Sequence, residues 1–100
     1  MKAKDERFYL VSYDIRNDRR WRRLYRTLRG YGQWLQLSVF HCRLTRRRLV
    51  SLEAAVREIV NHGEDHVLII DLGPAAGGTE PAVCSIGLPY KPPERLPVIV

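Results

Sequence analysis

An acid at the end of an apolar segment, followed at once by arginines, is the feature of this sequence best suited to chemistry. Residues 8–13 are apolar or aromatic except for Ser12, and they lead to Asp14. Seven arginines follow: Arg16, Arg19, Arg20, Arg22, Arg23, Arg26 and Arg29. A carboxylate is the hard oxygen ligand that Mg²⁺ prefers, and the arginine fork grips phosphate oxygens in pairs. The pattern predicts a site where a divalent metal and phosphate groups meet.

Two roles are open for Asp14. Magnesium keeps several of its waters, so one or two carboxylates are enough to hold it, and the axis of a homodimer can bring two Asp14 side chains around one ion. Such an ion lowers the pKa of a bound water and stabilises the transition state of phosphodiester cleavage. Alternatively, Asp14 caps the turn into the helix that follows. The first role makes Asp14 both a metal ligand and a catalytic residue.

The arginines open two expected helices, where they are electrostatically unfavourable. Basic side chains in the first turn oppose the helix macrodipole and cost roughly 0.3–1 kcal/mol each. A phosphate at either helix start would offset this cost by accepting from the free N–H groups and the arginines; otherwise the long side chains simply extend into water. We predict that the nucleic-acid contacts come from Arg16, Arg19, Arg20, Arg22, Arg23, Arg46 and Arg47.

The composition agrees with a nucleic-acid partner. The chain has 100 residues and a net charge of +6, which is the electrostatic footprint of a nucleic-acid binder. It has no apolar run long enough to span a membrane and no hydrophobic N-terminal signal, so we expect a cytoplasmic protein without a membrane partner. Its two cysteines lack the spacing of a zinc site or a redox pair.

The elements that must position these residues follow from hydrophobic periodicity. Apolar residues at Trp21, Leu24, Tyr25 and Leu28 have the spacing of one helix face. The expected order is a strand at 8–14, a helix to about Gly30, two strands within 33–44 with a tight break at 36–38, a helix from Thr45 to about 61–63, a strand at 66–72 and a short extra strand at 83–87. This β-α-β-β-α-β order predicts an α+β, ferredoxin-like sandwich. We assign residues 1–87 to this domain and 88–100 to a proline-rich tail.

The predicted sheet needs a second cover. Two helices cover only one face of four strands, yet segments 8–14 and 67–70 are apolar on both faces. The sheet of a second copy is the simplest cover for the other face, and we therefore expect a two-fold homodimer.

Several residues near the predicted break have alternative roles. Ser38 and Phe40 share one face by strand alternation. Ser38 either orients a water or a phosphate near Asp14 or is an ordinary strand serine, and Phe40 either packs in the core or the dimer interface or stacks on a base. His41 is a general base or a partly buried strand residue. Asp71 is a second acid or the polar end of its strand.

A family resemblance rests on three of these features together. They are Tyr13-Asp14-Ile15, the arginine-rich helix, and the segment Gln-Leu-Ser-Val-Phe at 36–40. This combination resembles the family of CRISPR-associated protein two, which partners the CRISPR integrase during spacer acquisition, and the resemblance covers residues 8 to about 87. It implies a ferredoxin-like homodimer, either a magnesium-dependent endonuclease acting on RNA or DNA or a structural bridge between integrase dimers that supports double-stranded DNA.

Carried over to this sequence, the family motif makes Asp14 the motif aspartate and Ser38 and Phe40 the motif serine and phenylalanine. The chain departs from the pattern twice. Trp34 stands where many members have a basic residue, so it would stack on substrate instead of pairing with it, and His41 stands where many have glutamate. One carboxylate per chain is few for a nuclease, which keeps the non-catalytic scaffold open beside the endonuclease.

Overall fold

A computed structural model describes residues 5–76 and 84–87 of the chain. The elements are β1 (Arg7–Asp14), α1 (Asp18–Arg29), β2 (Gly32–Gln36), β3 (Val39–Leu44), α2 (Arg46–Ile59) and β4 (His66–Pro74). The β-α-β-β-α-β order and the break between the second and third strands are therefore confirmed. Neither described helix is long and apolar enough to cross a membrane.

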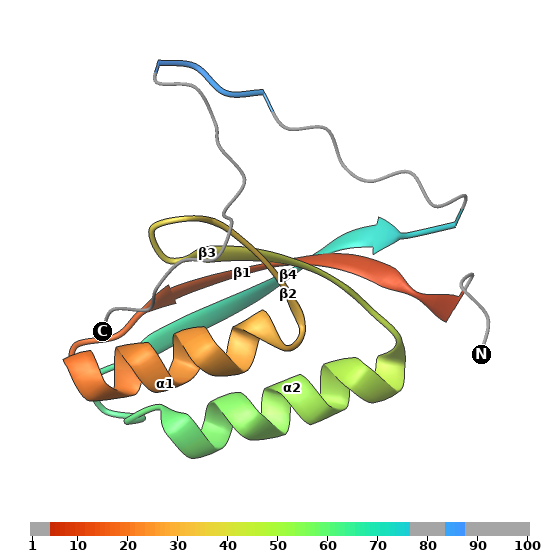
Figure 1. Cartoon of the computed structure of the whole chain (residues 1–100). Coiled ribbons are helices and arrows are strands. Elements are labelled where there is room, and N and C mark those ends of the chain that lie inside the picture. Colours follow the sequence, from red (N-terminus) through yellow and green to blue (C-terminus); the bar gives the residue numbers. More distant parts are fainter. Residues whose placement is uncertain (1–4, 77–83, 88–100) are drawn as a thin grey trace.

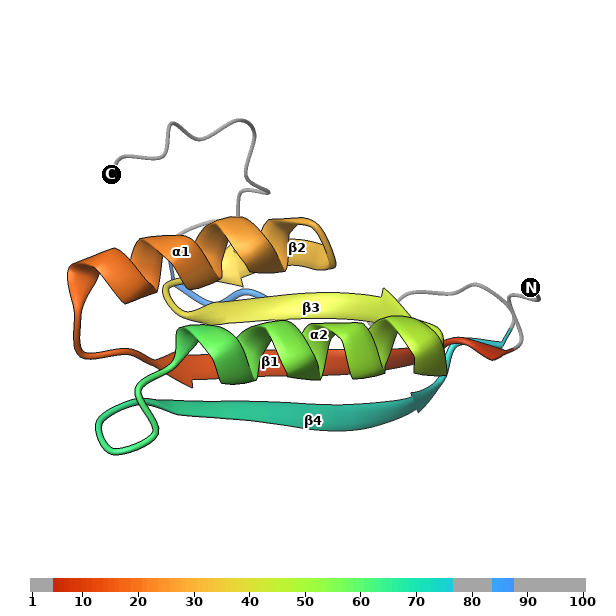
Figure 2. The same ribbon diagram turned by 90° about the horizontal axis from the view of Figure 1, so that it is seen from below.

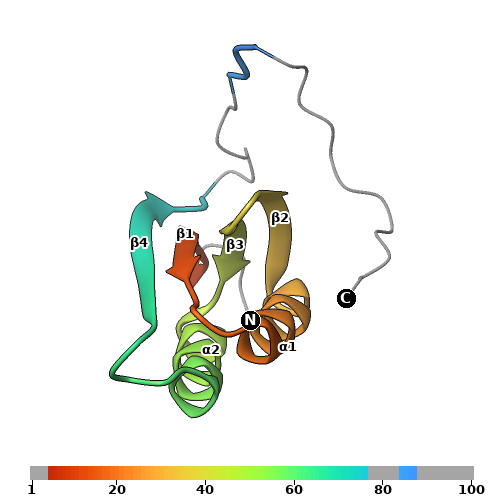
Figure 3. The ribbon, with the colours of Figure 1, turned by 90° about the vertical axis from the view of Figure 1, so that its left-hand side faces the viewer.

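One antiparallel sheet carries both helices on the same face. The strand order is β2-β3-β1-β4, so β1 pairs with β3 on one side and with β4 on the other. Figure 1 and Figure 3 show α1 and α2 together on one side of this sheet. In Figure 2 the two helices run side by side, and β4 lies on the outer side of α2. This is the predicted ferredoxin-like arrangement.

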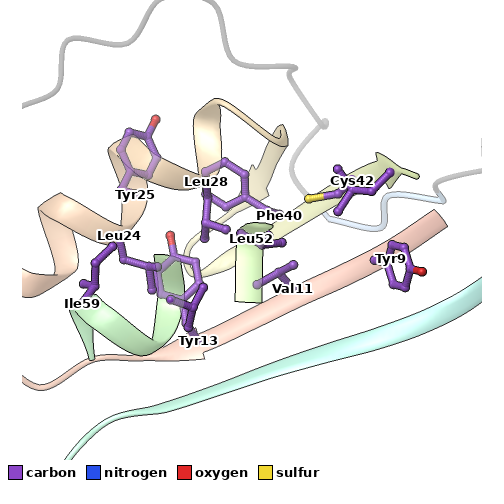
Figure 4. Close-up of a cluster of buried hydrophobic side chains, with 12 residues drawn as sticks. Tyr9, Val11, Tyr13, Leu24, Tyr25, Leu28, Phe40, Cys42, Leu52 and Ile59 are labelled. Atoms are coloured by element: carbon purple, nitrogen blue, oxygen red, sulfur yellow. The ribbon is translucent and has the colours of Figure 1, made fainter. Parts of the chain in front are cut away.

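The core lies between the helices and the sheet. Tyr9, Val11 and Tyr13 alternate along β1 and are buried beneath the helices, as the period of a strand requires. The side chains of Leu24 and Leu28 come down from α1 and are fully buried in the same cluster (Figure 4). Both tyrosines are therefore core residues.

The other face of the sheet has no such cover. Leu68, Ile70 and Leu72 of β4 are 46%, 42% and 47% exposed. The expectation that β4 is covered on both faces is therefore not met by the described residues of a single chain, because both helices lie on the opposite side. The homodimer that would cover this face remains a prediction.

The short extra strand is not found where residues are described. Residues 84–87 form no strand and are exposed. A strand exists only where its backbone groups pair with a neighbouring strand, and these residues belong to no ladder of the sheet. Val83 and the expected tail at 88–100 lie outside the described residues.

Candidate functional site

Asp14 is the last residue of β1 and is exposed. It follows Tyr13, which is buried under the helices, so alternation turns its side chain toward the helix-free face of the sheet. Its carboxylate makes no hydrogen bond or ion pair within the described part of the chain. The cap of α1 is Asn17, whose side chain accepts from the backbone N–H of Arg20 at 2.9 Å. The alternative role of Asp14 as a cap is therefore wrong.

His66 is the cross-strand partner of Asp14. The antiparallel register of β1 and β4 pairs Asp14 with His66 and Ser12 with Leu68. Directly opposed residues of an antiparallel pair share a face, with Cβ atoms about 4.5–5.5 Å apart. The register therefore places two exposed residues, Asp14 and His66, opposite each other on the same face of the sheet.

The residue before His66 holds this end of the molecule together. The carboxylate of Asp65 is fully buried. It accepts from the backbone N–H of Arg16 at 3.0 Å, from that of Asn61 at 2.8 Å, and from the Nε of Arg20 at 2.6 Å. The guanidinium of Arg20 and these backbone donors hold the pKa of Asp65 far below its usual range. Asp65 thereby ties the loop after Asp14 to the start of β4.

This arrangement corrects the prediction for Arg20. Its guanidinium bonds both oxygens of Asp65 and also reaches Glu64 at 3.0 Å, so it is already occupied by carboxylates of its own chain. The predicted anion sites at the helix starts are likewise filled by side chains, since Asn17 caps α1 and Thr45 caps α2. At the start of α1, the charge of Arg20 is thus balanced by carboxylates of its own chain.

The remaining predicted arginines fall into two separate groups. The first group is Arg16, Arg19, Arg22 and Arg23, and the second is Arg46 and Arg47. None of these side chains makes an ion pair within the described residues. The first group lies at the Asp14 end of the molecule. The second lies at the start of α2, just after β3, whose last residue Leu44 pairs with Arg7 at the opposite end of β1. The length of β1 separates the two groups by roughly 24 Å.

The motif residues are distributed differently from the prediction. Ser38 lies in the turn before β3, where its carbonyl accepts from the N–H of Tyr13 at 3.0 Å, one residue from Asp14. Phe40 is fully buried and meets Tyr25 edge-on, so core packing is correct and a substrate contact by its ring is wrong. Trp34 is half-buried, and its indole N–H donates to the carbonyl of Leu37 at 2.8 Å.

Neither His41 nor Asp71 supplies a second group beside Asp14. His41 pairs with Leu10, four residues back along β1 and therefore about 13 Å away. Asp71 lies near the opposite end, where it accepts from the N–H of Gly73 and pairs with Arg7 at 3.1 Å, and these contacts lower its pKa. Asp71 thus serves as a structural anion.

Sequence reasoning missed the parts played by Asp65 and His66. A signal for His66 was present, because the predicted topology sets the last strand antiparallel beside the first. The start of one must then lie next to the end of the other. Asp65 left no such signal, since Arg16 and Arg20 are far away in sequence and two of its three donors are backbone groups.

The residues present suit an open, water-rich metal site. The carboxylate of Asp14 is a hard oxygen donor, and no positively charged side chain of the described residues forms an ion pair with it. Within those residues no three His, Cys, Asp or Glu side chains gather in a group that can enclose a metal. Magnesium binding through one carboxylate and several waters fits this arrangement.

The β2-β3-β1-β4 sheet order and the single helix layer define a ferredoxin-like α+β protein. The model of the family described as CRISPR associated protein Cas2 matches residues 7–76. The chain belongs to this family, as its motif predicted.

Individual relatives agree with this assignment. A CRISPR-associated endoribonuclease Cas2 from Geobacter sulfurreducens is 62% identical over 95 residues, which cover 95% of this chain and 99% of that protein. A second, from Rhodospirillum rubrum, is 42% identical over 95 residues, covering 95% and 92%. The crystal structure of a hypothetical protein TT1823 from Thermus thermophilus matches with a TM-score of 0.68 at 36% identity, covering 86% of this chain and 99% of that one.

The hydrogen bonds that the Asp65 carboxylate accepts make the free energy of unfolding depend on pH in the acid range. The folded-state pKa of Asp65 is depressed, so its contribution is complete well above the ordinary value of about 3.9 and is lost as the pH falls below it. Asp65→Asn should lower the free energy of unfolding at pH 7 by about 2 kcal/mol and flatten its dependence on acid. Urea unfolding at pH 3 to 7 measures both effects. Asp71→Asn, which alters an exposed ion pair, should cost less; an equal cost would contradict the assignment.

Proposed function

We propose that this chain is a metal-dependent endonuclease of CRISPR adaptation, the acquisition of spacers, which cleaves phosphodiester bonds in RNA or DNA. The names of the Geobacter and Rhodospirillum relatives support a nuclease, because both are called endoribonucleases. The observation that carries the proposal is Asp14, an exposed carboxylate at a strand end with no partner within the described residues. A carboxylate held in this way is available to a metal ion.

The active unit in this proposal is a homodimer. Each copy covers the other's helix-free face, where Leu68, Ile70 and Leu72 are now 42–47% exposed. Burying apolar surface contributes roughly 25 cal/mol per Å². Contact with a second sheet is therefore more favourable for this face than contact with water. An axis near the ends of β1 and β4 would bring the two Asp14 side chains together.

Each group then has a distinct task. Asp14 of both copies would hold Mg²⁺, which when bound supplies an activated water and offsets charge that develops at phosphorus. Arg16 and Arg19, at the same end of the molecule, would hold substrate phosphates through charge-assisted hydrogen bonds. Ser38 is one strand away and would help to orient the attacking water.

A second candidate function is a scaffold without catalysis. The same dimer would bind double-stranded DNA and bridge dimers of the CRISPR integrase. The separation of the arginine groups, roughly 24 Å along β1, favours contact with an extended duplex. A single phosphate group cannot reach both of them.

The proposed metal site predicts the effect of Asp14→Asn. Cleavage of labelled single-stranded RNA or duplex DNA in Mg²⁺ should fall at least about a hundredfold, because the metal loses its protein ligand, while binding in EDTA should persist. Gel assays with Mg²⁺ and with EDTA measure cleavage and binding separately. Asp18→Asn removes the same charge from the first turn of α1 and should retain cleavage. If the wild type binds duplex and never cuts, the scaffold is the correct function.

The arginine groups predict a salt dependence. Arg19→Gln with Arg23→Gln should weaken binding to both short RNA and long duplex, because these side chains lie at the Asp14 end. Arg46→Gln with Arg47→Gln should weaken only the long duplex. Each lost phosphate contact should reduce the slope of log Kd against log salt by about 1. Fluorescence anisotropy at several salt concentrations measures the slopes; unchanged slopes in both double variants would refute these contacts.

The proposed dimer predicts how charged substitutions on the helix-free face of the sheet change the oligomeric state. Leu68→Asp with Ile70→Asp should convert the dimer to a monomer, because two unpaired carboxylates would be buried against the partner sheet. Analytical ultracentrifugation measures the mass. Leu37→Asp, at a site 76% exposed in the β2–β3 turn, is the matched control and should stay dimeric. A wild type that sediments as a monomer at all concentrations would contradict the proposal.

A further inference from the structure

The imidazole of His66 lies in the one position along β4 that directly faces Asp14. The register between β1 and β4 is continuous from Tyr9 to Asp14, and its last pair is Asp14 with His66. The only irregularity in this pairing lies between Phe8 and Tyr9, at the far end. The two side chains are therefore neighbours, with Cβ atoms about 4.5–5.5 Å apart.

Contacts elsewhere on the same face support this use of the register. Phe8 pairs with Arg43 across β1 and β3, and the guanidinium of Arg43 indeed lies 5.8 Å from the ring centre of Phe8. This directly opposed pair on the helix-free face thus meets through its side chains. His66 is also exposed, so water has free access to it.

The hydrogen bonds of Asp65 fix the backbone beside both Asp14 and His66. Asp65 is bonded directly to His66 in the chain, and its buried carboxylate accepts from the N–H of Arg16, two residues after Asp14. The same carboxylate is held by Arg20 and by the N–H of Asn61. The backbones on either side of the pair are thus tied to a single buried group, which is the support that a precise donor site needs.

A carboxylate beside an imidazole has a chemical preference. Mg²⁺ takes oxygen ligands, whereas imidazole nitrogen suits transition-metal ions, which also accept carboxylates. We propose that Asp14 and His66 together form a mixed oxygen–nitrogen site that selects a divalent transition-metal ion, such as Mn²⁺, over Mg²⁺. In this site Asp14 supplies the charge that binds either ion, and His66 supplies the discrimination between them.

The proposal rests on the metal site proposed at Asp14 and extends it. A two-fold dimer with Asp14 near its axis brings two carboxylates and two imidazoles to one place. One chain contributes only half of this set, which agrees with the finding that no three ligating side chains gather within its described residues. The preference for the ion is then a property of the assembly.

The test measures metal binding without any cleavage. The full-length wild type and His66→Gln are titrated with Mn²⁺, and free Mn²⁺ is followed by electron paramagnetic resonance; Mg²⁺ is then added as a competitor. His66→Gln should weaken Mn²⁺ binding about tenfold, as loss of a metal-site contact does, and change Mg²⁺ binding less than about twofold, since Mg²⁺ depends on oxygen. Circular dichroism checks that the variant is folded, and His66→Asn provides a second substitution.

His62→Gln is the matched control, because His62 lies in the loop just before β4 and its ring contacts the carbonyl of Arg57. It should bind Mn²⁺ as the wild type does. Equal Mn²⁺ affinity in the wild type and both His66 variants would overturn the role of His66 and leave Asp14 as a metal ligand. Mn²⁺ binding that survives Asp14→Asn unchanged would instead refute the metal site itself. Equal losses in the His62 and His66 variants would also overturn the proposal.

Discussion

The buried carboxylate of Asp65 is the interaction on which the functional end of this protein depends. Three segments meet there: the loop after β1, the first turn of α1 and the loop before β4. A buried carboxylate without partners would be costly, and one with a guanidinium and two backbone donors is stable. Because the donors come from separate segments, the cluster fixes the end of β1 relative to the start of β4. The orientation of Asp14 and His66 follows from that.

The same cluster divides the arginines into two kinds. Arg20 is held by Asp65 and Glu64 and acts inside the fold, whereas Arg19 and Arg23 on the same helix have no anionic partner within the described residues. An arginine that is already in a bidentate pair gains little from a phosphate, because the phosphate must displace a carboxylate. The number of arginines therefore overstates the surface that is available to nucleic acid, and their positions matter more than their total charge.

Most of the fold could be predicted from the sequence, since periodicity located all four strands and both helices of the sheet domain. The site was less predictable. Asp14 could be found because a charged residue at the end of an apolar strand stands out, and its orientation followed from alternation. The engagement of Arg20 could not be found, because an ion pair across 45 residues has no local pattern. Phe40 could not be assigned between core and surface until the neighbouring rings of Tyr13 and Tyr25 were placed.

The position of Asp14 on an open apolar face links the proposed dimer to the proposed metal. A second sheet would bury Leu68 and Ile70 favourably, yet it would also bring two carboxylates toward each other near the axis. Like charges at short range repel, and burial without compensation adds to the cost. A divalent cation between the carboxylates removes the repulsion and converts the pair into a ligand set. Dimerisation and metal binding should therefore be thermodynamically coupled, because each lowers the cost of the other. The single acid per chain is then explained, since two chains are needed to make one site.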